Sequence, residues 1–160
     1  MEQRLERDAI LQCLCAEHRR LSVVLEQLTA AQALRPNVVG YWSVKDVVSH
    51  LVFWNQFAVN EVSAAVQGRV FPHPPGTGDE INALAVAEYS AEDWDEVRSL
   101  FEQSCRQVIN LVENLPNEAF EPDNRVEQVL EETVHGALSN NTYEHWSLHE
   151  AQIRAWIDTL

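Results

Sequence analysis

The sequence contains few of the residues that interrupt regular structure or crosslink a chain. Among its 160 residues, 5 are glycine, 6 are proline and 3 are cysteine. Such a composition excludes a disordered, Pro/Gly-rich chain. A small and odd number of cysteines is typical of the reducing cytosol, where thiols stay unpaired. We therefore expect a globular cytoplasmic protein whose core forms by ordinary packing.

Long apolar runs are also missing. No segment approaches the roughly 18 consecutive apolar residues that a transmembrane helix requires. The first ten residues, MEQRLERDAI, have neither an apolar signal segment nor a small-residue cleavage site. The sequence therefore predicts that a membrane is not a partner.

Basic residues are scarce. The chain has 11 lysines and arginines against 25 aspartates and glutamates, which gives a net charge of −14. Because proteins bind phosphates mainly through lysine and arginine, this balance predicts that nucleic acid is not a partner. A small-molecule substrate, either uncharged or held by a metal, fits the charge better.

The clearest pattern that the sequence does contain is helical periodicity. Apolar residues recur at helical spacing, and no segment alternates as a strand would. The motifs SVKD at Ser43 and SAED at Ser90 have the form of capping boxes, which predicts that helices begin there. The predicted long helices span about residues 3–29, 43–68, 90–115 and 133–159.

The connections between these helices differ greatly in length. Residues 68–80, GRVFPHPPGTGDE, form a long Pro/Gly-rich connection between the second and third helices, followed by a short helical piece at 81–89. A loop between Pro116 and Pro122 and a brief helical segment precede the fourth helix. We predict an all-α fold with one domain, residues 1–160. It is a four-helix bundle of antiparallel neighbours in which the long connection permits one crossover. A homodimer is compatible with such a bundle.

The fourth predicted helix is polar at the centre of its otherwise apolar face. His145 and His149 lie four residues apart in HWSLHEAQIRAW, so both imidazoles share one face. An unpartnered polar group in a core costs about 1–3 kcal/mol, and leucine would serve stability better. His50 holds a comparable position among large apolar residues of the second helix. Three converging histidines would suit a divalent metal with a position left open for water or substrate.

Other polar residues are candidates for the same site. Asn141, one turn before the histidine pair, is placed to face the open position, and Glu61 is a candidate general base on the second helix. Asp46 and Gln152 are candidates to orient the histidine rings. His18 on the first helix is either a fourth ligand or a core histidine. The simpler alternative for the histidines is hydrogen bonding within the bundle.

Two motifs resemble those of the DinB-like (DinB/YfiT) superfamily. YWSVKDVVSHLVFW, residues 41–54, is similar to its second-helix signature, and HWSLHEAQIRAW, residues 145–156, is similar to its fourth-helix signature. The order and separation of the motifs also match. The resemblance implies a four-helix bundle that holds a divalent metal, often nickel or zinc, at positions matching His50, His145 and His149.

The same resemblance implies two kinds of function. Similar proteins include thiol S-transferases and isomerases that use a low-molecular-weight thiol such as bacillithiol or mycothiol. The chain also resembles the ClbS/DfsB branch, which is linked to resistance by hydrolysis of a genotoxic metabolite and typically lacks a match to His149. We expect a metal-dependent enzyme that acts on a small electrophile by thiol transfer or hydrolysis. The alternatives are a metal-free binding or resistance protein and a structural dimer.

Overall fold

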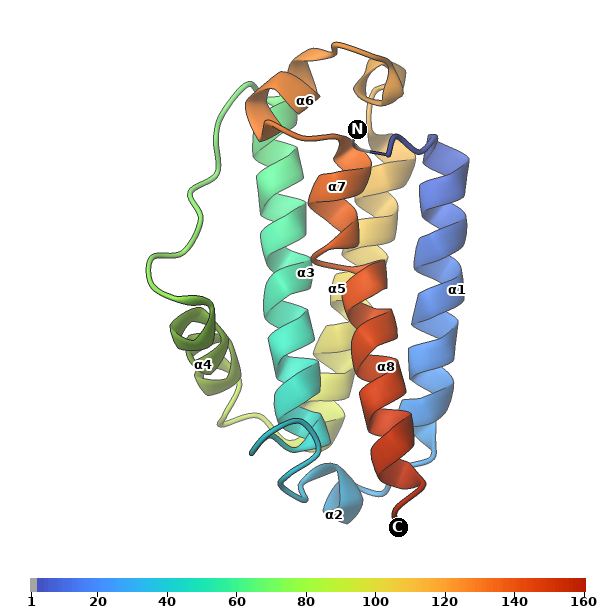
Figure 1. Cartoon of the computed structure of the whole chain (residues 1–160), viewed down its shortest axis with the longest axis vertical. Coiled ribbons are helices and arrows are strands. Elements are labelled where there is room, and N and C mark those ends of the chain that lie inside the picture. The colour runs from blue at the N-terminus through green and yellow to red at the C-terminus, as the bar shows by residue number, and fades with distance from the viewer. Residues whose placement is uncertain (1–2) are drawn as a thin grey trace.

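The computed structural model describes residues 3–160, and four columns of helix run side by side through it (Figure 1). Three columns are single helices and the fourth is made of two consecutive helices. The columns are α1 (Arg7–Glu26), α3 (Val44–Val66), α5 (Trp94–Asn114), and α7 (Val134–Ser139) with α8 (Tyr143–Ile157). Within residues 3–160 no strand forms apart from an isolated bridge between Val39 and Trp42. The predicted all-α four-helix bundle is confirmed.

Short helices close the two ends of the bundle and cover one side. In Figure 1, α2 lies below the bundle, α6 lies above it, and α4 lies on the outer side of α3. Their bounds are α2 (Ala30–Ala33), α4 (Gly78–Glu88), the 3-10 helix η1 (Asn117–Phe120) and α6 (Arg125–Leu130). The short helical piece predicted at 81–89 is therefore a helix of 11 residues, which begins at the capping box of Thr77 and Glu80.

The long connection returns the chain from one end of the bundle to the other. It leaves the upper end of α3, carries α4 down the outside and enters α5 at the lower end (Figure 1). As a result α3 and α5, which pack directly against each other, run parallel and not antiparallel. The predicted crossover is present, and it sets the relative direction of these two helices.

Three predicted helix boundaries are wrong, and the first is the start of the first long helix, which lies at Arg7 and not at residue 3. The third long helix does not begin at Ser90, because Asp93 is its N-cap and forms a capping box with Glu96 over distances of 2.8 and 2.9 Å. The first long helix ends at Glu26, and a separate capping box at Thr29 starts α2. At α5 the later cap residue satisfies the free N–H groups of the first turn, so Ser90 is not used, and at Thr29 a new cap starts a separate short helix where a continuous one was expected.

The fourth predicted helix, residues 133–159, is broken and not continuous. Side chains of Asn140, Asn141 and Thr142 each donate a hydrogen bond to the backbone carbonyl four residues earlier, over 2.6 to 3.3 Å. Such side chains compete with the backbone amides that would continue a helix. Thr142 leaves the helical region, with φ −125° and ψ −107°, and α8 then begins as a separate segment.

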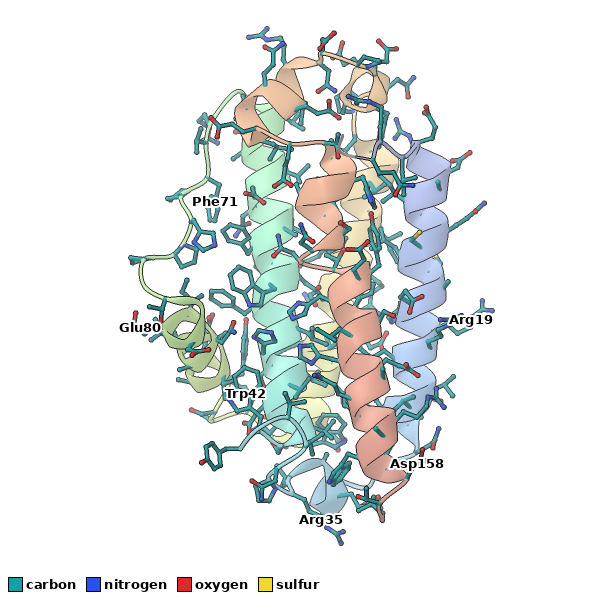
Figure 2. All side chains as sticks on the ribbon, viewed as in Figure 1. Arg19, Arg35, Trp42, Phe71, Glu80 and Asp158 are labelled. Atoms are coloured by element: carbon teal, nitrogen blue, oxygen red, sulfur yellow. The ribbon has the colours of Figure 1, made fainter. Side chains whose placement is uncertain are left out.

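The core fills the space between the four columns. Its fully enclosed side chains include Ile10, Leu14, Leu21, Leu51, Phe101, Trp146 and Ile153. Burying one side chain of this size stabilises the fold by about 1.5–3 kcal/mol. Charged side chains such as Arg19 and Asp158 lie on the outside of the columns, as Figure 2 shows. None of the helices described between residues 3 and 160 has the length and apolar character to span a membrane.

Candidate metal centre

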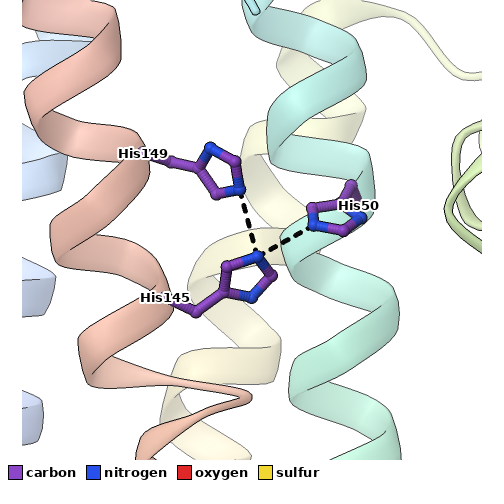
Figure 3. A group of neighbouring side chains, drawn as sticks. All are labelled: His50, His145 and His149. Atoms are coloured by element: carbon purple, nitrogen blue, oxygen red, sulfur yellow. Dashed lines mark hydrogen bonds between the residues drawn. The ribbon is translucent and has the colours of Figure 1, made fainter. Parts of the chain in front are cut away.

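His50 lies two turns into α3, and a capping box determines where that helix begins. The Asp46 carboxylate accepts a hydrogen bond from the backbone N–H of Ser43 at 2.9 Å, and the Ser43 hydroxyl accepts one from the Asp46 N–H at 3.1 Å. Asp46 was expected to orient a histidine ring, but its carboxylate belongs to this cap. The box anchors the helix turn that directs His50 towards α8 (Figure 3).

The three predicted histidines meet between α3 and α8. The Nε2 atom of His145 lies 2.9 Å from Nε2 of His50 and 3.0 Å from Nε2 of His149 (Figure 3). One nitrogen from each ring can be chosen so that all three lie within 4.8 Å of one another. The structure therefore brings together two residues of one helix and a third that is 95 positions away in the sequence.

Burial holds these imidazoles in their neutral form. His50 and His149 expose only 3% and 6% of their surface. Burial and the neighbouring histidines lower the pKa of His50 to about 3, and burial and His149 lower the pKa of His145 to about 4. Burial also lowers the pKa of His149, opposed by a hydrogen bond to Gln152. Neutral imidazole is the form that binds a metal.

Hydrogen bonds outside the cluster favour the same orientation. Gln152 Oε1 lies 2.7 Å from Nδ1 of His149 and can accept a hydrogen bond from the Nδ1–H group, which leaves the Nε2 lone pair directed at the other histidines. This is the role predicted for Gln152. The Nδ1 atoms of His50 and His145 are buried and have no hydrogen-bond partner among residues 3–160. Each such group lowers the stability of the fold, so packing alone does not explain why imidazoles occupy these positions.

The spacing of the nitrogens fits a divalent metal. Metal–nitrogen bonds of about 2.0–2.1 Å place neighbouring ligand nitrogens roughly 2.9–3.4 Å apart in octahedral or tetrahedral geometry. The two separations that His145 makes, 2.9 and 3.0 Å, agree with this range and are also hydrogen-bond distances, and the third pair of nitrogens lies within 4.8 Å. Three imidazole ligands suit zinc or nickel and leave at least one coordination position free. The residues present therefore fit the metal that the sequence motifs imply.

The histidines form part of the wall of a cavity of about 630 Å³. Ring centroids of Trp42 and Trp54 lie 5.1 and 6.4 Å from that of His50, so two of the five tryptophans wall the site. Asn141 lines the cavity, where the sequence placed it. The remaining lining residues were not identified from the sequence, and they are Val39, Gly40, Tyr41, Asn82, Asn140 and Leu148.

Glu61 lies elsewhere. Between positions 50 and 61 the α-helix rises about 16 Å, and Glu61 lines a separate cavity of about 190 Å³ together with Phe71 and Leu130. Burial and the nearby Glu132 raise its pKa. The structure does not bring Glu61 to the histidines and gives no support to its predicted role as their general base.

His18 forms a different cluster, between α1 and α5. Its Nε2 atom lies 2.7 Å from a carboxylate oxygen of Glu102, and the Ser22 hydroxyl donates to the other oxygen at 3.1 Å. The group of three histidines that converge does not include it. Of the two interpretations of His18, the structure supports a histidine that is satisfied within the bundle.

Asn55 positions α8 and was not singled out from the sequence. It is fully buried, and its Oδ1 accepts a hydrogen bond from the Trp146 indole N–H at 2.8 Å. Its amide nitrogen donates to the Ser104 hydroxyl at 2.9 Å. One side chain of α3 thus holds both α5 and α8. Because Trp146 directly follows His145, this contact also helps to place His145. The only signal in the sequence is a polar residue one turn after Leu51 on a mostly apolar face.

Comparisons with known proteins agree with this architecture. The sequence profile of the DinB superfamily matches residues 14–153, whereas no curated protein matches the chain. The colibactin self-resistance protein ClbS, solved in complex with dsDNA, has 16% identity and a TM-score of 0.75 over 96% of each chain. An uncharacterised protein from Escherichia coli UTI89 has 16% identity and a TM-score of 0.79 over 96% of this chain and 94% of its own. DfsB, described as a sibling lethal factor precursor, has 14% identity and a TM-score of 0.76 over 98% of each chain.

The structure of ClbS contradicts one expectation. The net charge of −14 was taken to exclude nucleic acid, yet a protein similar in fold to this chain was crystallised with dsDNA. Net charge is a sum over the whole surface, whereas contact with phosphates depends on the side chains at the interface. The charge argument therefore does not exclude nucleic acid for this fold.

Proposed function

The chain belongs to the DinB superfamily, and on this premise we propose that it is a divalent-metal-dependent enzyme that acts on a small electrophile. One observation carries the proposal: three imidazole nitrogens, from the buried His50 and His149 and the half-buried His145, converge in the wall of a cavity large enough for a small molecule. A cluster with no purpose other than stability would leave the unpartnered Nδ1 of His50 as a net cost.

In this proposal His50, His145 and His149 hold the metal, with zinc or nickel as the ions that suit the ligands. A bound metal would act as a Lewis acid that lowers the pKa of a thiol or a water molecule in the open position. The two chemistries that follow are transfer of a low-molecular-weight thiol to the electrophile and hydrolysis. Gln152 keeps the lone pair of His149 directed at the metal.

Other residues of the cavity would bind and shield the substrate. Asn141 lines the cavity beside the histidines, and its carbonyl oxygen can accept a hydrogen bond from a nucleophile or a substrate amide. Trp42 and Trp54 lie beside His50 in the cavity wall and would reduce the access of water. These contacts position a substrate next to the metal without supplying a charged group.

Metal analysis of protein purified without a histidine tag tests the proposal. We expect about one metal per chain in the wild type and a large loss in His149→Ala and His50→Ala, because two imidazoles bind a divalent metal much more weakly than three. His73→Ala is the matched control, since His73 is exposed and outside the cluster. Metal content that is the same in all four proteins would contradict the proposal. Thiol transfer and hydrolysis of a model electrophile should be lost together with the metal.

A metal-free resistance role with duplex DNA as a partner is a second candidate. It is favoured by ClbS, which is a self-resistance protein solved with dsDNA. Fluorescence anisotropy of a labelled duplex at increasing salt concentration tests DNA binding. This candidate predicts binding that weakens with salt and survives both chelator and His149→Ala. Absence of binding even at low salt would rule it out.

A further inference from the structure

The cavity beside the histidines has no charged side chain in its wall. Charged residues make up 22% of the sequence, yet none of the lining residues, all within the described part of the chain, is an aspartate, glutamate, lysine or arginine. A charged group that enters such a cavity loses hydration without gaining an ion pair, which is unfavourable. The wall therefore selects against ligands that bring a charge to any place except the histidine cluster.

An apolar surface continues from the interior of the cavity to its mouth. Trp42 and Trp54 lie inside, and Tyr41 and Leu148 line the cavity although 90% and 55% of their surfaces are exposed. Exposed large apolar side chains that border a cavity are typical of a binding surface. Indole and phenol rings favour flat partners, which gain area by stacking on them. This surface fits a ligand with a flat apolar body.

Three asparagines supply the polar contacts. Asn140 and Asn141 donate their amide hydrogens to backbone carbonyls of α7, and no group among residues 3–160 donates to their Oδ1 atoms. Asn82, on α4, accepts from the Trp54 indole N–H at 3.1 Å, and within the same part of the chain its amide N–H groups have no acceptor. The cavity thus offers uncharged hydrogen-bond acceptors and donors, and together they complement the N–H and C=O groups of an amide.

We propose that the substrate is an uncharged molecule with a flat apolar body and an amide group, and that Asn82 and Leu148 determine this specificity. The inference rests on the proposed function, because the reacting group is the part that approaches the histidines. Asn82 joins α4 to α3 through Trp54, so the external helix contributes a recognition group. Leu148, an exposed apolar residue of the cavity wall, offers no positive charge to an anionic substrate.

Three indole compounds of similar shape test the inference: indole-3-acetamide is neutral, indole-3-acetate is an anion and tryptamine is a cation. Each is titrated into metal-free and zinc-loaded protein, and binding is measured from the NMR shifts of the indole N–H groups of the cavity tryptophans. In metal-free protein we expect indole-3-acetamide to bind about tenfold or more tightly than the two charged compounds. Equal affinity for a charged compound, or no shift with any of the three, would overturn the proposal.

Two variants should change the preference in opposite directions. Asn82→Asp keeps the acceptor for Trp54 and adds a negative charge, so it should favour tryptamine. Leu148→Arg adds a positive charge at an exposed position and should favour indole-3-acetate. Asn110→Asp, an exposed change on α5 away from the cavity, is the control and should leave all three affinities unchanged. If both cavity variants keep the wild-type preference, these residues do not determine specificity.

Failure of the two proposals can be distinguished. Zinc titration of the same samples reports the metal site directly, whereas the preference among the indoles in metal-free protein reports only the chemistry of the cavity wall. Protein that binds no zinc but prefers the amide would refute the metal-dependent function alone. Protein that binds one zinc but prefers a charged indole would refute the substrate class alone.

Discussion

Asn55 connects three helices through hydrogen bonds that are fully shielded from water. Its two polar atoms pair with Trp146 on α8 and Ser104 on α5. Buried amide contacts of this kind have a strict geometry, so they limit the rotation and the axial position of the helices that they join. His145 and His149 are on either side of Trp146 along α8. The arrangement of the three histidines therefore depends on a residue that touches none of them.

Asn55→Leu should destabilise the fold and weaken metal binding. The change leaves the Trp146 N–H buried without a partner and removes the donor to Ser104, and each unsatisfied group costs about 1–3 kcal/mol. Urea unfolding measures the first effect and zinc titration the second. Ser104→Ala is the control, because it removes the contact of Asn55 to α5, together with the Ser104 bond to the Phe101 carbonyl, and leaves the contact to Trp146 in place. Zinc affinity that falls equally in both variants would argue against Asn55 as the residue that positions α8.

Glu61→Gln should stabilise the protein at neutral pH. Burial and Glu132 raise the pKa of the Glu61 carboxyl in the folded state. The folded chain therefore holds this proton more tightly than the unfolded chain, and the penalty for ionisation appears as the pH rises through the folded pKa. Removing the charge should give a gain in unfolding free energy at about pH 7 that disappears below the ordinary carboxyl pKa of 4.5. The gain is reduced by partial exposure of the side chain to water.

Urea unfolding at both pH values checks this expectation, with Glu118→Gln on an exposed surface as the control. An equal gain at both pH values would show that packing and not ionisation is responsible. Because Glu61 lies outside the histidine cavity, its replacement should leave zinc binding unchanged.

At the scale of the helices, the N-terminus of α5 allows a test of capping in which two nearby candidate cap residues, Asp93 and Ser90, are compared. Asp93 and Glu96 form the capping box, whereas the Ser90 side chain, which the sequence suggested, has no such role. Asp93→Ala should lower the free energy of unfolding by about 1 kcal/mol, and Ser90→Ala should change it by less than about 0.5 kcal/mol. Thermal or urea unfolding of the two variants measures the difference. A larger loss in Ser90→Ala would contradict the observed cap.

The break between α7 and α8 has a consequence for the site. Asn140 and Asn141 interrupt the fourth column and also line the cavity. The break at Thr142 sets where α8 starts. A continuous helix would place the histidines of α8 at a different angle around the helix axis. The same short segment thus sets the start of α8 and contributes polar groups to the binding surface.

At the scale of the whole molecule, a ligand that binds only the folded state raises its stability. The three histidines come from two helices, and they cannot converge in the unfolded chain. A zinc concentration one hundred times the dissociation constant adds about 2.7 kcal/mol, which corresponds to a rise in Tm of about 5–10 °C for a chain of this size. Thermal unfolding with zinc and with chelator measures the rise. His149→Ala should lose it, and an equal rise in that variant would indicate a different zinc site.

The secondary structure and the residues of the histidine cluster follow from local patterns. Helical periodicity and the position of large apolar residues predict the long helices, because each helix must bury one face whatever its neighbours are. The polar pair His145 and His149 on such a face, with His50 on another, is visible without coordinates. Helix boundaries were less certain, as Ser90 shows, because several residues near a helix start can act as caps and only one is used.

The sequence by itself determined that this chain is a bundle of amphipathic helices with histidines on two inner faces. Only the tertiary structure decided that these histidines share one cavity, that Glu61 is not in it, and that Asn82 from α4 is. The physical reason is that periodicity records which side of a helix is buried but not which helix lies opposite. The partner and its axial position depend on contacts between distant residues, such as Asn55 with Trp146, that no local pattern encodes.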